Sequence, residues 1–550
     1  MRNGSIGFAV WLAIGGAAGV EAAQSPYAAV SGVVLNDATG TPLRRAVITL
    51  VTADPPHFEA VTFTESNGAF GFTAIPPGNY RLRAEVNGFE RAWFGASDPR
   101  RPPGTLKLAA GDYRYGITFR LRPLGSISGT VLDADGDPVP NVQVRLLQST
   151  WRRLKPAYAN EGATRTDDRG QYHLNEVVPG EYIVMVMQLN EAIATTSEVT
   201  VGQPANEKMY AAQFYPDASR PSEAAPLQIG AGETREGIDF HLAPRAVARL
   251  HGTVVLPHDV TRSRGVRIAV YPQQLPDGSN QAGAHTGTRG GNEFEIPNLV
   301  AGPYVVEARL DGAERDYSAV ERVELPPGGL ELTLRLEPDA DVNGRVDLEG
   351  AERPEEGLRV ALISGGDPPG YRRRDAVVKP DGTFSIQNVQ PGIWDISVQP
   401  VPPGGYIKSM RLGDQDVLTE DMTIRWDTHD PLHIVVSARG GVVTGTVTVP
   451  KGLARSPRAS VLLAPDGKFA DVLSFYRHAY ADDSGHFEIK GITPGRYKLY
   501  AFEELDPAAF EDPGFLKPYE PRGQAFDVAE GAHVDRETEL IPVEQQAPQR

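Results

Sequence analysis

The sequence predicts an all-β protein made of a tandem array of five β-sandwich modules. Three observations predict this fold class. One pattern of apolar residues at strand spacing occurs five times in the 550 residues, and a glycine that opens another strand pattern recurs every 92 to 123 residues. Gly (58 residues) and Pro (46 residues) are abundant, while 40% of the residues are hydrophobic. This composition is typical of a protein that has many short strands joined by turns and still buries a hydrophobic core.

Each copy of the repeat begins at a turn residue, which is Gly68, Gly170, Asn292, Gly382 or Gly485. An aromatic residue follows two positions later, apolar residues follow at four and seven positions, a glycine at ten and another aromatic at twelve. Alternation at the second and fourth positions predicts a half-buried strand, and the shift to the seventh predicts that this strand ends in a bend or bulge. Pro-Gly then predicts a turn in which the glycine takes a positive φ. The aromatic at position twelve, such as Tyr182, is predicted to anchor the core.

A G-x-V strand opens each module, and its glycine is Gly32, Gly129, Gly252, Gly344 or Gly445. The spacing of these glycines is the size of one sandwich domain. We therefore expect modules at 24–123, 124–245, 246–338, 339–438 and 439–541, between a signal peptide (1–23) and a polar tail (542–550). The closing strand of one module nearly abuts the opening strand of the next, which predicts a semi-rigid rod.

The N-terminal residues have the pattern of an export signal. Arg2 precedes an apolar run from Ile6 to Val20, and the small residues Ala22 and Ala23 follow it. This order predicts a Sec signal peptide that is cut after Ala22 or Ala23, with an uncleaved anchor as the alternative. No later segment is apolar enough to span a membrane, so we expect a secreted, periplasmic or cell-surface protein of a bacterium.

Composition excludes several classes of function. The chain has no Cys, which excludes disulfides, thiolate metal sites, cysteine nucleophiles and a lipid-modified N-terminal cysteine. Its formal charge is −17, whereas proteins that bind nucleic acid or anionic membranes need a basic face. We therefore expect neither nucleic acid nor an anionic membrane surface as a partner.

The repeat core, D/N-x-x-G-x-Y/F followed by P-G-x-Y, resembles the carboxypeptidase regulatory-like domain. That family has an immunoglobulin-like or transthyretin-like sandwich, also described as a carbohydrate-binding-like fold, and is related to the B-type repeats of bacterial adhesins. The resemblance covers about residues 27–541. It implies a seven-stranded sandwich that is used as an accessory, adhesive or sugar-binding module.

The sequence contains no convincing pattern of catalytic residues. His173 and Glu176 have a zinc-ligand spacing, but His173 occupies the solvent-facing third position of the repeat, where other copies have Gly, Glu or Ser. No further ligand set accompanies the pair. Nucleophile-elbow, P-loop and dinucleotide-binding motifs are missing. We expect no enzyme activity, no metal and no cofactor.

Acidic and basic clusters have simpler interpretations. The run from Asp133 to Asp137 begins like a calcium loop, but Pro138 and Val144 occupy positions that require Gly and Glu. We expect an ordinary turn, with adventitious calcium as the alternative. The pairs Asp167-Asp168 and Asp482-Asp483 are also predicted to be turn residues. The arginine-rich stretch 371–375 is predicted to be a solvated loop.

Five aromatic residues outside the repeat register are the candidate ligand-binding residues: Trp93, Trp151, Tyr215, Tyr406 and Trp426. Aromatic faces stack on sugars and fill protein hot spots. The alternative is that each covers the edge of its own core. The sequence thus predicts a non-catalytic binding protein for a polysaccharide or other envelope material. The second hypothesis is a scaffold that spaces or displays an envelope protein.

Overall fold

A computed structural model describes residues 26–96, 103–152, 155–188, 209–258, 260, 265–273, 284–288, 291–312, 315–350, 357–364, 372–451, 459–482, 484–503, 505 and 509–542. The predicted signal peptide and nearly all of the predicted tail lie outside these ranges. The described residues form an all-β protein, as predicted, with only short 3-10 turns between the strands. Within these ranges, no helix is both long and apolar enough to cross a bilayer.

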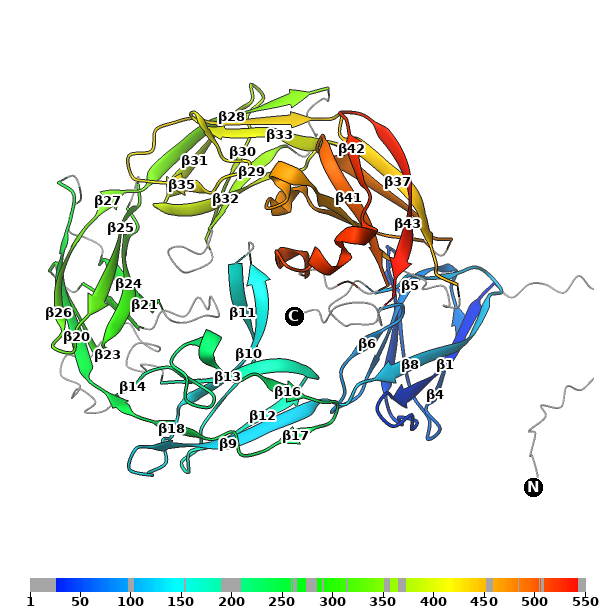
Figure 1. The fold of residues 1–550 in the computed structure, drawn as a ribbon, viewed down its shortest axis with the longest axis horizontal. Coiled ribbons are helices and arrows are strands. Elements are labelled where there is room, and N and C mark those ends of the chain that lie inside the picture. Colours follow the sequence, from blue (N-terminus) through cyan, green and yellow to red (C-terminus); the bar gives the residue numbers. More distant parts are fainter. Residues whose placement is uncertain are drawn as a thin grey trace, which may run out of the picture. The chain divides into compact units, whose positions relative to one another are not determined.

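By compactness the chain divides into two units, Met1–Arg122 and Pro123–Arg550. Unit 1 contains one group of strands and unit 2 contains four (Figure 1). Strand pairing between described residues stays within one of these five consecutive groups.

The first group, in unit 1, contains β1 (Ala28–Asn36), β2 (Val47–Thr52), β3 (Glu59–Phe63), β4 (Ala69–Ile75), β5 (Gly78–Glu85), β6 (Ala92–Trp93), β7 (Leu106–Leu108) and β8 (Tyr113–Leu121). Its two sheets have the orders β4-β1-β8 and β3-β2-β5-β6, and β7 also pairs with β5.

Unit 2 begins with the second group, which contains β9 (Gly125–Asp133), β10 (Gln143–Arg152), β11 (Lys155–Arg165), β12 (Gln171–Val177), β13 (Gly180–Met187), β14 (Met209–Tyr210), β15 (Gln213–Phe214), η2 (Pro221–Glu223), β16 (Leu227–Ile229), β17 (Thr234–Arg235), β18 (Phe240–Leu242) and β19 (Pro244–Arg245). The third group contains β20 (Val247–Val255), β21 (Arg267–Pro272), β22 (Ala284–Gly287), β23 (Glu293–Val300), β24 (Gly302–Leu310), β25 (Tyr317–Leu325), β26 (Leu330–Arg335) and β27 (Glu337–Pro338).

The fourth group contains β28 (Ala340–Glu349), β29 (Arg359–Ser364), β30 (Arg373–Val377), β31 (Thr383–Val389), β32 (Gly392–Gln399), β33 (Tyr406–Leu412), β34 (Gln415–Asp416), β35 (Met422–Ile424) and β36 (Leu432–Ser437). The fifth contains β37 (Gly441–Thr448), β38 (Ser460–Pro465), η3 (Gly467–Phe469), η4 (Leu473–Phe475), β39 (Arg477–Tyr480), β40 (His486–Ile492), β41 (Gly495–Phe502), η5 (Ala509–Glu511), η6 (Lys517–Arg522), β42 (Ala525–Val528) and β43 (His533–Ile541).

All five groups share one plan of strand pairing. The opening strand pairs antiparallel with the strand of the repeat and parallel with the closing strand, as β1 does with β4 and β8. The second strand pairs antiparallel with the strand that follows the repeat turn, as β2 does with β5. In the fifth group β43 also pairs with β41, so that its two sheets join along one edge.

The opening glycine of each group lies opposite the first aromatic of the repeat. Gly32 pairs in register with Phe70, and the same pairing joins glycine and aromatic in the other four groups. A Cβ added to Gly32 would lie 2.8 Å from the ring of Phe70 and would collide with the carbonyl oxygen of Ile117 on β8. The strand therefore needs glycine because the ring and the parallel strand occupy the space of a side chain.

The predicted bulge is present in every copy. The register between the opening strand and the repeat strand shifts after position four. The residue at position six takes a left-handed backbone conformation, with φ from 56° to 68°, and it is Ala74, Glu176, Asn298, Asn388 or Gly491. Side chains of four different kinds occupy this position, so its conformation is imposed by the fold rather than by a preference for glycine.

The second aromatic of the repeat anchors the turn by burial and by a hydrogen bond. The Tyr182 hydroxyl donates to the Val178 carbonyl oxygen at 2.7 Å, and the side chain is buried. The corresponding Tyr or Trp in each other copy donates to the carbonyl four residues before it, at 2.7 to 2.9 Å. Every copy has Tyr or Trp here and none has Phe, because the anchor needs a donor at its tip.

The prediction for the turn glycine is confirmed in two copies only. The glycine at position ten takes a positive φ at Gly302 (152°) and Gly392 (150°), but not at Gly78, Gly180 or Gly495. A Cβ at Gly180 would lie 3.3 Å from the Tyr182 hydroxyl oxygen. Backbone conformation therefore favours glycine in the third and fourth groups, and close approach of the anchoring ring favours it at Gly180.

Each group buries its own hydrophobic cluster, and among the described residues no large cluster mixes two groups. Smaller clusters in the second and fifth groups also stay within their group. This distribution supports the proposal that the groups fold as separate modules with the boundaries given above.

Variants of Tyr182 test both the anchor and the proposed modules. Tyr182→Phe keeps the ring but removes the hydrogen bond to Val178, and should cost about 0.5–1.5 kcal/mol. Tyr182→Ala also removes the buried ring and should cost about 3–5 kcal/mol. Limited proteolysis should then cut within 124–245 first. Tyr115→Phe, at an exposed side chain, is the control and should be neutral. Unfolding of the whole chain in one step by Tyr182→Ala would contradict separate modules.

The glycine beneath the ring yields a second prediction. Gly32→Ala should destabilise unit 1 by about 1–3 kcal/mol, because the backbone carbonyl and the ring cannot both move aside. Gly71→Ala is a matched control on the neighbouring strand, since its Cβ would lie 3.9 Å from the nearest atom, the Val30 carbonyl oxygen. Urea unfolding of both variants measures the difference. Equal stability of the two variants would show that the contact at Gly32 does not constrain the fold.

Candidate functional site

The structure does not gather the five predicted aromatics into one site. Tyr406 on β33 is only 3% exposed, so its ring offers no face to a ligand. Tyr215 is half-buried and packs edge-on against Phe240, with the ring centroids 6.0 Å apart. Tyr215 thus covers the core of the second group, as in the alternative interpretation, whereas the Tyr406 hydroxyl donates to Glu530 of the fifth group at 3.4 Å.

The three tryptophans differ in exposure. Trp93 on β6 is half-buried, and the Arg83 guanidinium lies over its ring at 5.7 Å from the centroid. Trp151 near the end of β10 is also half-buried. Trp426, in the turn after β35, is 55% exposed and presents an open ring.

A pair of tyrosines that the sequence reasoning missed forms a more open aromatic surface. Tyr113 and Tyr115 on β8 are 57% and 72% exposed. Their rings are nearly parallel, at 14°, and their centroids are 6.0 Å apart. Both side chains project from one face because they are two residues apart on a strand. The signal was present in the stretch YRYGITF, but this stretch was interpreted only as a closing strand.

Exposed apolar side chains are concentrated in unit 1. Of the seven large hydrophobic residues that are exposed in the described ranges, five lie in this unit. Besides the tyrosine pair they include Val61 and Phe63, which are two residues apart on β3. Among the described strands, β8 and β3 are edge strands of their sheets. Unit 1 therefore presents two apolar surfaces, one on each sheet.

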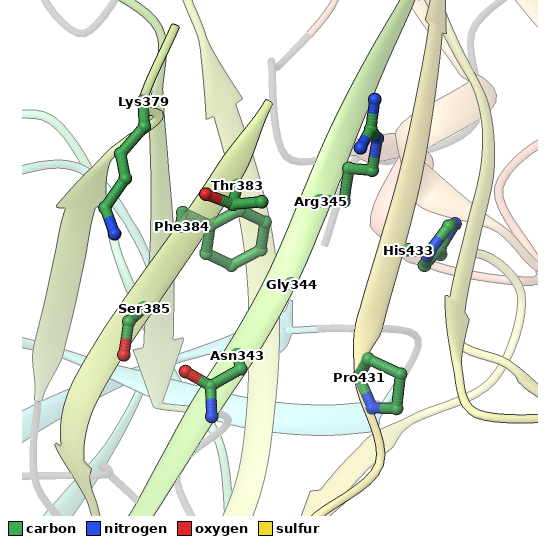
Figure 2. Close-up of a pocket in the computed structure, with 9 residues that line it drawn as sticks. All are labelled: Asn343, Gly344, Arg345, Lys379, Thr383, Phe384, Ser385, Pro431 and His433. Carbon is green, nitrogen blue, oxygen red and sulfur yellow. The ribbon is translucent and has the colours of Figure 1, made fainter. Parts of the chain in front are cut away.

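A shallow hollow of about 320 Å³ lies on the outer face of the sheet β31-β28-β36 in the fourth group. Figure 2 shows Asn343, Ser385 and His433 on three neighbouring strands around it. Within the described ranges, no hydrogen bond joins Ser385 to His433, so they do not form a nucleophile and base. The hollow offers hydrogen-bonding groups of the kind that hold hydroxyls, and nothing in it points to catalysis.

The remaining motifs are structural. His173 is exposed on β12, as expected for the third position of the repeat. Asp133 Oδ1 accepts hydrogen bonds from the backbone N–H groups of Asp135 and Asp137, as in an ordinary turn. Asp167 and Asp482 bond the backbone of their own turns in the same way. Over the described ranges, no cluster of three or more His, Asp or Glu side chains could hold a metal.

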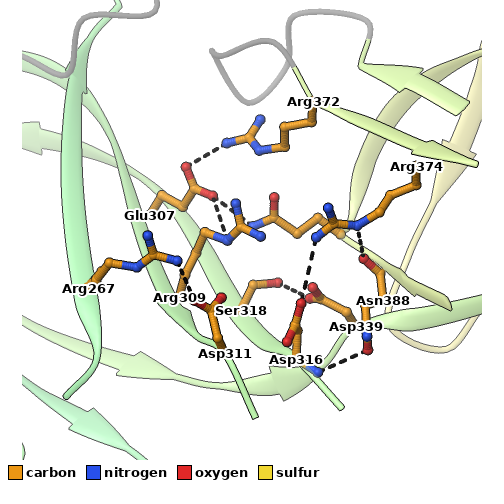
Figure 3. A network of polar contacts seen from close by, with 11 residues as sticks. Arg267, Glu307, Arg309, Asp311, Asp316, Ser318, Asp339, Arg372, Arg374 and Asn388 are labelled. Atoms are coloured by element: carbon orange, nitrogen blue, oxygen red, sulfur yellow. Dashed lines mark hydrogen bonds and ion pairs between the residues drawn. The ribbon is translucent and has the colours of Figure 1, made fainter. Parts of the chain in front are cut away.

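The arginine-rich stretch is not a solvated loop, so that prediction is wrong for its described part, 372–375. Arg372 precedes β30, and its side chain is only 12% exposed. Its Nη2 lies 2.6 Å from Oε2 of Glu307, a carboxylate on β24 that is itself 3% exposed (Figure 3). Arg374 Nη2 lies 3.6 Å from Asp316. Arg372 and Arg374 therefore lie in a polar seam between the third and fourth groups, because acidic partners far away in the sequence pair with them. Arg373 and Asp375 are exposed and lie 4.0 Å apart.

Asp339 is a second buried carboxyl in this seam (Figure 3). Burial raises its pKa to about 6 from the ordinary value of 3.8, and this exceeds the opposing effects of the Ser318 hydrogen bond and of Arg309. Ser318 donates to its Oδ1, whereas its Oδ2 is buried without a hydrogen-bond partner in the described ranges. The protonated form therefore suits the folded chain better than the ionised form does.

Comparison with protein families gives two matches. Residues 29–121 and 126–212 match the carboxypeptidase regulatory-like domain. The predicted family is confirmed for these two segments. They comprise about a third of the chain, and the first of these regulatory-like domains carries the tyrosine pair. A comparison with curated proteins found no match.

Similar solved structures include two streptococcal pilins and a Bacillus anthracis protein. A streptococcal ancillary pilin is 9% identical with a TM-score of 0.20, and the match covers 56% of this chain and 98% of the pilin. The minor pilin of Streptococcus agalactiae is 13% identical with a TM-score of 0.20, covering 43% and 99%. The Bacillus anthracis TIE protein is 12% identical with a TM-score of 0.17, and this chain spans 51% of its length. At these TM-scores the likeness carries no argument.

The pKa of Asp339 predicts how stability depends on pH. Because its folded pKa is raised, its ionisation destabilises the fold, and stability should increase as the pH falls through about 6. Asp339→Asn should therefore raise the urea midpoint at about pH 7.5 and leave it nearly unchanged at about pH 4. The control is Asp311→Asn, at an exposed carboxylate paired with Arg267. A variant that lowers the midpoint equally at both pH values would contradict the prediction.

Proposed function

We propose that this protein is an exported, non-catalytic binding protein that recognises a polysaccharide of the bacterial envelope. The observation that carries the proposal is the tyrosine pair Tyr113 and Tyr115 on β8. Two aromatic rings that are both more than half exposed on one strand form an apolar patch that a ligand can cover. Parallel rings on a strand edge suit the apolar faces of successive sugar units, since stacking needs no deep pocket.

Several features support binding rather than chemistry. Apart from the buried Asp339, the carboxylates and imidazoles considered above hold turns, form ion pairs or face solvent singly. The regulatory-like family is consistent with an accessory role, and the exposed apolar residues favour unit 1 as the ligand-binding part. Trp426 is an additional candidate in the fourth group, and Trp93 and Trp151 are weaker candidates because they are half-buried.

A second candidate function is that of a scaffold that displays or spaces an envelope protein. Val61 and Phe63, 52% and 63% exposed on the edge strand β3, favour this alternative. An exposed edge strand with apolar side chains is a common docking surface for another chain. Variants of the two apolar surfaces of unit 1 therefore distinguish the two hypotheses.

Affinity electrophoresis against a broad panel of polysaccharides tests the first proposal. A polysaccharide that the protein recognises should retard it, and the double variant Tyr113→Ala, Tyr115→Ala should lose most of this retardation. Its melting temperature should change little, because the two rings contribute to ligand contact rather than to the core.

The double variant Val61→Ala, Phe63→Ala is the matched control in the same unit. It should keep the retardation by polysaccharide. If instead no glycan retards the protein, and an envelope protein co-purifies in a way that depends on Val61 and Phe63, the scaffold function replaces the first proposal. Hydrolysis of the bound ligand by the pure protein would overturn both.

A further inference from the structure

The polar seam in unit 2 borders a partly open cavity of about 200 Å³. Its described lining comes from the third and fourth groups and consists of Arg309, Arg372, Arg373, Arg374, Asn388, Gln390 and Trp394. Four of these seven residues are arginines and none is acidic, although Glu307 and Asp316, which are not among them, pair with Arg372 and Arg374. A cavity lined in this way is suited to an anion.

One wall of the cavity is fixed by Glu307. This buried carboxylate accepts a hydrogen bond from Arg372 and another, at 2.7 Å, from Nε2 of Gln390. Trp394 Nε1 donates to the Gln390 backbone carbonyl at 2.9 Å, which holds the same residue from the other side. These contacts fix the lining before any ligand binds, and a fixed site loses less entropy on binding.

Gln390 also has an unused acceptor. Because its Nε2 is committed to Glu307, the amide orientation is set, and its Oε1 is buried without a hydrogen-bond partner among the described residues. A buried acceptor without a donor costs free energy. A ligand that carries a hydroxyl could donate to it.

Two of the arginines are only loosely paired. Arg309 Nε lies 3.9 Å from Glu307 and Arg373 Nε lies 4.0 Å from Asp375. Both distances are at the outer limit of an ion pair. Guanidinium groups bind carboxylates through two parallel hydrogen bonds, which these distances do not provide. Arg309 and Arg373 therefore retain donors for an added carboxylate.

We propose that the seam cavity binds a uronic acid unit of an acidic polysaccharide. Its carboxylate lies between Arg309 and Arg373, and a ring hydroxyl donates to Gln390 Oε1. This assignment rests on the proposed function, which it narrows from glycans in general to acidic glycans. A neutral sugar lacks the carboxylate, and a simple inorganic oxyanion lacks the ring hydroxyls.

Calorimetric titration of the full chain with glucuronate, glucose and sulfate tests this assignment. Glucuronate should bind, glucose should not, and sulfate should bind more weakly than glucuronate. Arg373→Gln should weaken glucuronate binding about tenfold or more, since it removes a charged hydrogen-bonding partner. The control is Arg267→Gln, because this arginine pairs with Asp311 and does not line the cavity.

Equal affinity for glucose and glucuronate, sulfate binding as tight as glucuronate binding, or an unchanged affinity in Arg373→Gln would overturn the assignment. Failure here is distinguishable from failure of the proposed function. The tyrosine double variant should still bind glucuronate, and Arg373→Gln should keep the part of the retardation by polysaccharide that depends on Tyr113 and Tyr115. If polysaccharide retardation depends on the tyrosines while glucuronate fails to bind, only the seam assignment is lost.

Discussion

Each strand group depends on one contact, in which an aromatic ring packs over a glycine that has no side chain. In the first group the ring is that of Phe70 and the glycine is Gly32, and the carbonyl of Ile117 closes the space from the other side. Three strands therefore meet at one point: the opening strand, the repeat strand and the parallel closing strand. The ring fills the space that a side chain at the glycine would take, which fixes the register of both ladders at once. The bulge and the anchored turn follow a few residues further along the same chain segment.

Spacing in the sequence was sufficient to predict the strands, the bulge and the anchoring aromatics, because each of these recurs at a fixed offset in five copies. It was not sufficient to place the left-handed residue of the bulge. Ala74, Glu176 and Asn298 occupy that position, and their side chains have nothing in common. The hydrogen bond from Tyr182 to Val178 could have been inferred, since the second aromatic is never Phe, whereas the first aromatic usually is.

The candidate sites were less predictable for two different physical reasons. Arg372 is interpreted wrongly from local sequence because its partner, Glu307, is 65 residues away, and only the fold brings the two charges together. Tyr406 is buried although two glycines precede it, because it is the first residue of β33 and pairs with Ser437 in the sheet of the fourth group. Tyr113 and Tyr115 have the alternation of an ordinary strand, and only their exposure in the structure distinguishes a surface pair from a core pair. Unit 1 thus offers apolar contacts at strand edges, whereas the seam of unit 2 offers charge.

The parallel pairing of first and last strands determines how a group responds to mechanical load. β1 and β8 are the first and last strands of unit 1, and they run in the same direction side by side over the rungs from Ala29 to Asn36. A pull on the two ends of the unit drags these strands past each other, so that the hydrogen bonds of the ladder bear the force together. Strands paired as an antiparallel hairpin would instead open one rung at a time. β37 and β43 in the fifth group are paired in the same parallel way. Resistance to shear is therefore built into the strand order itself.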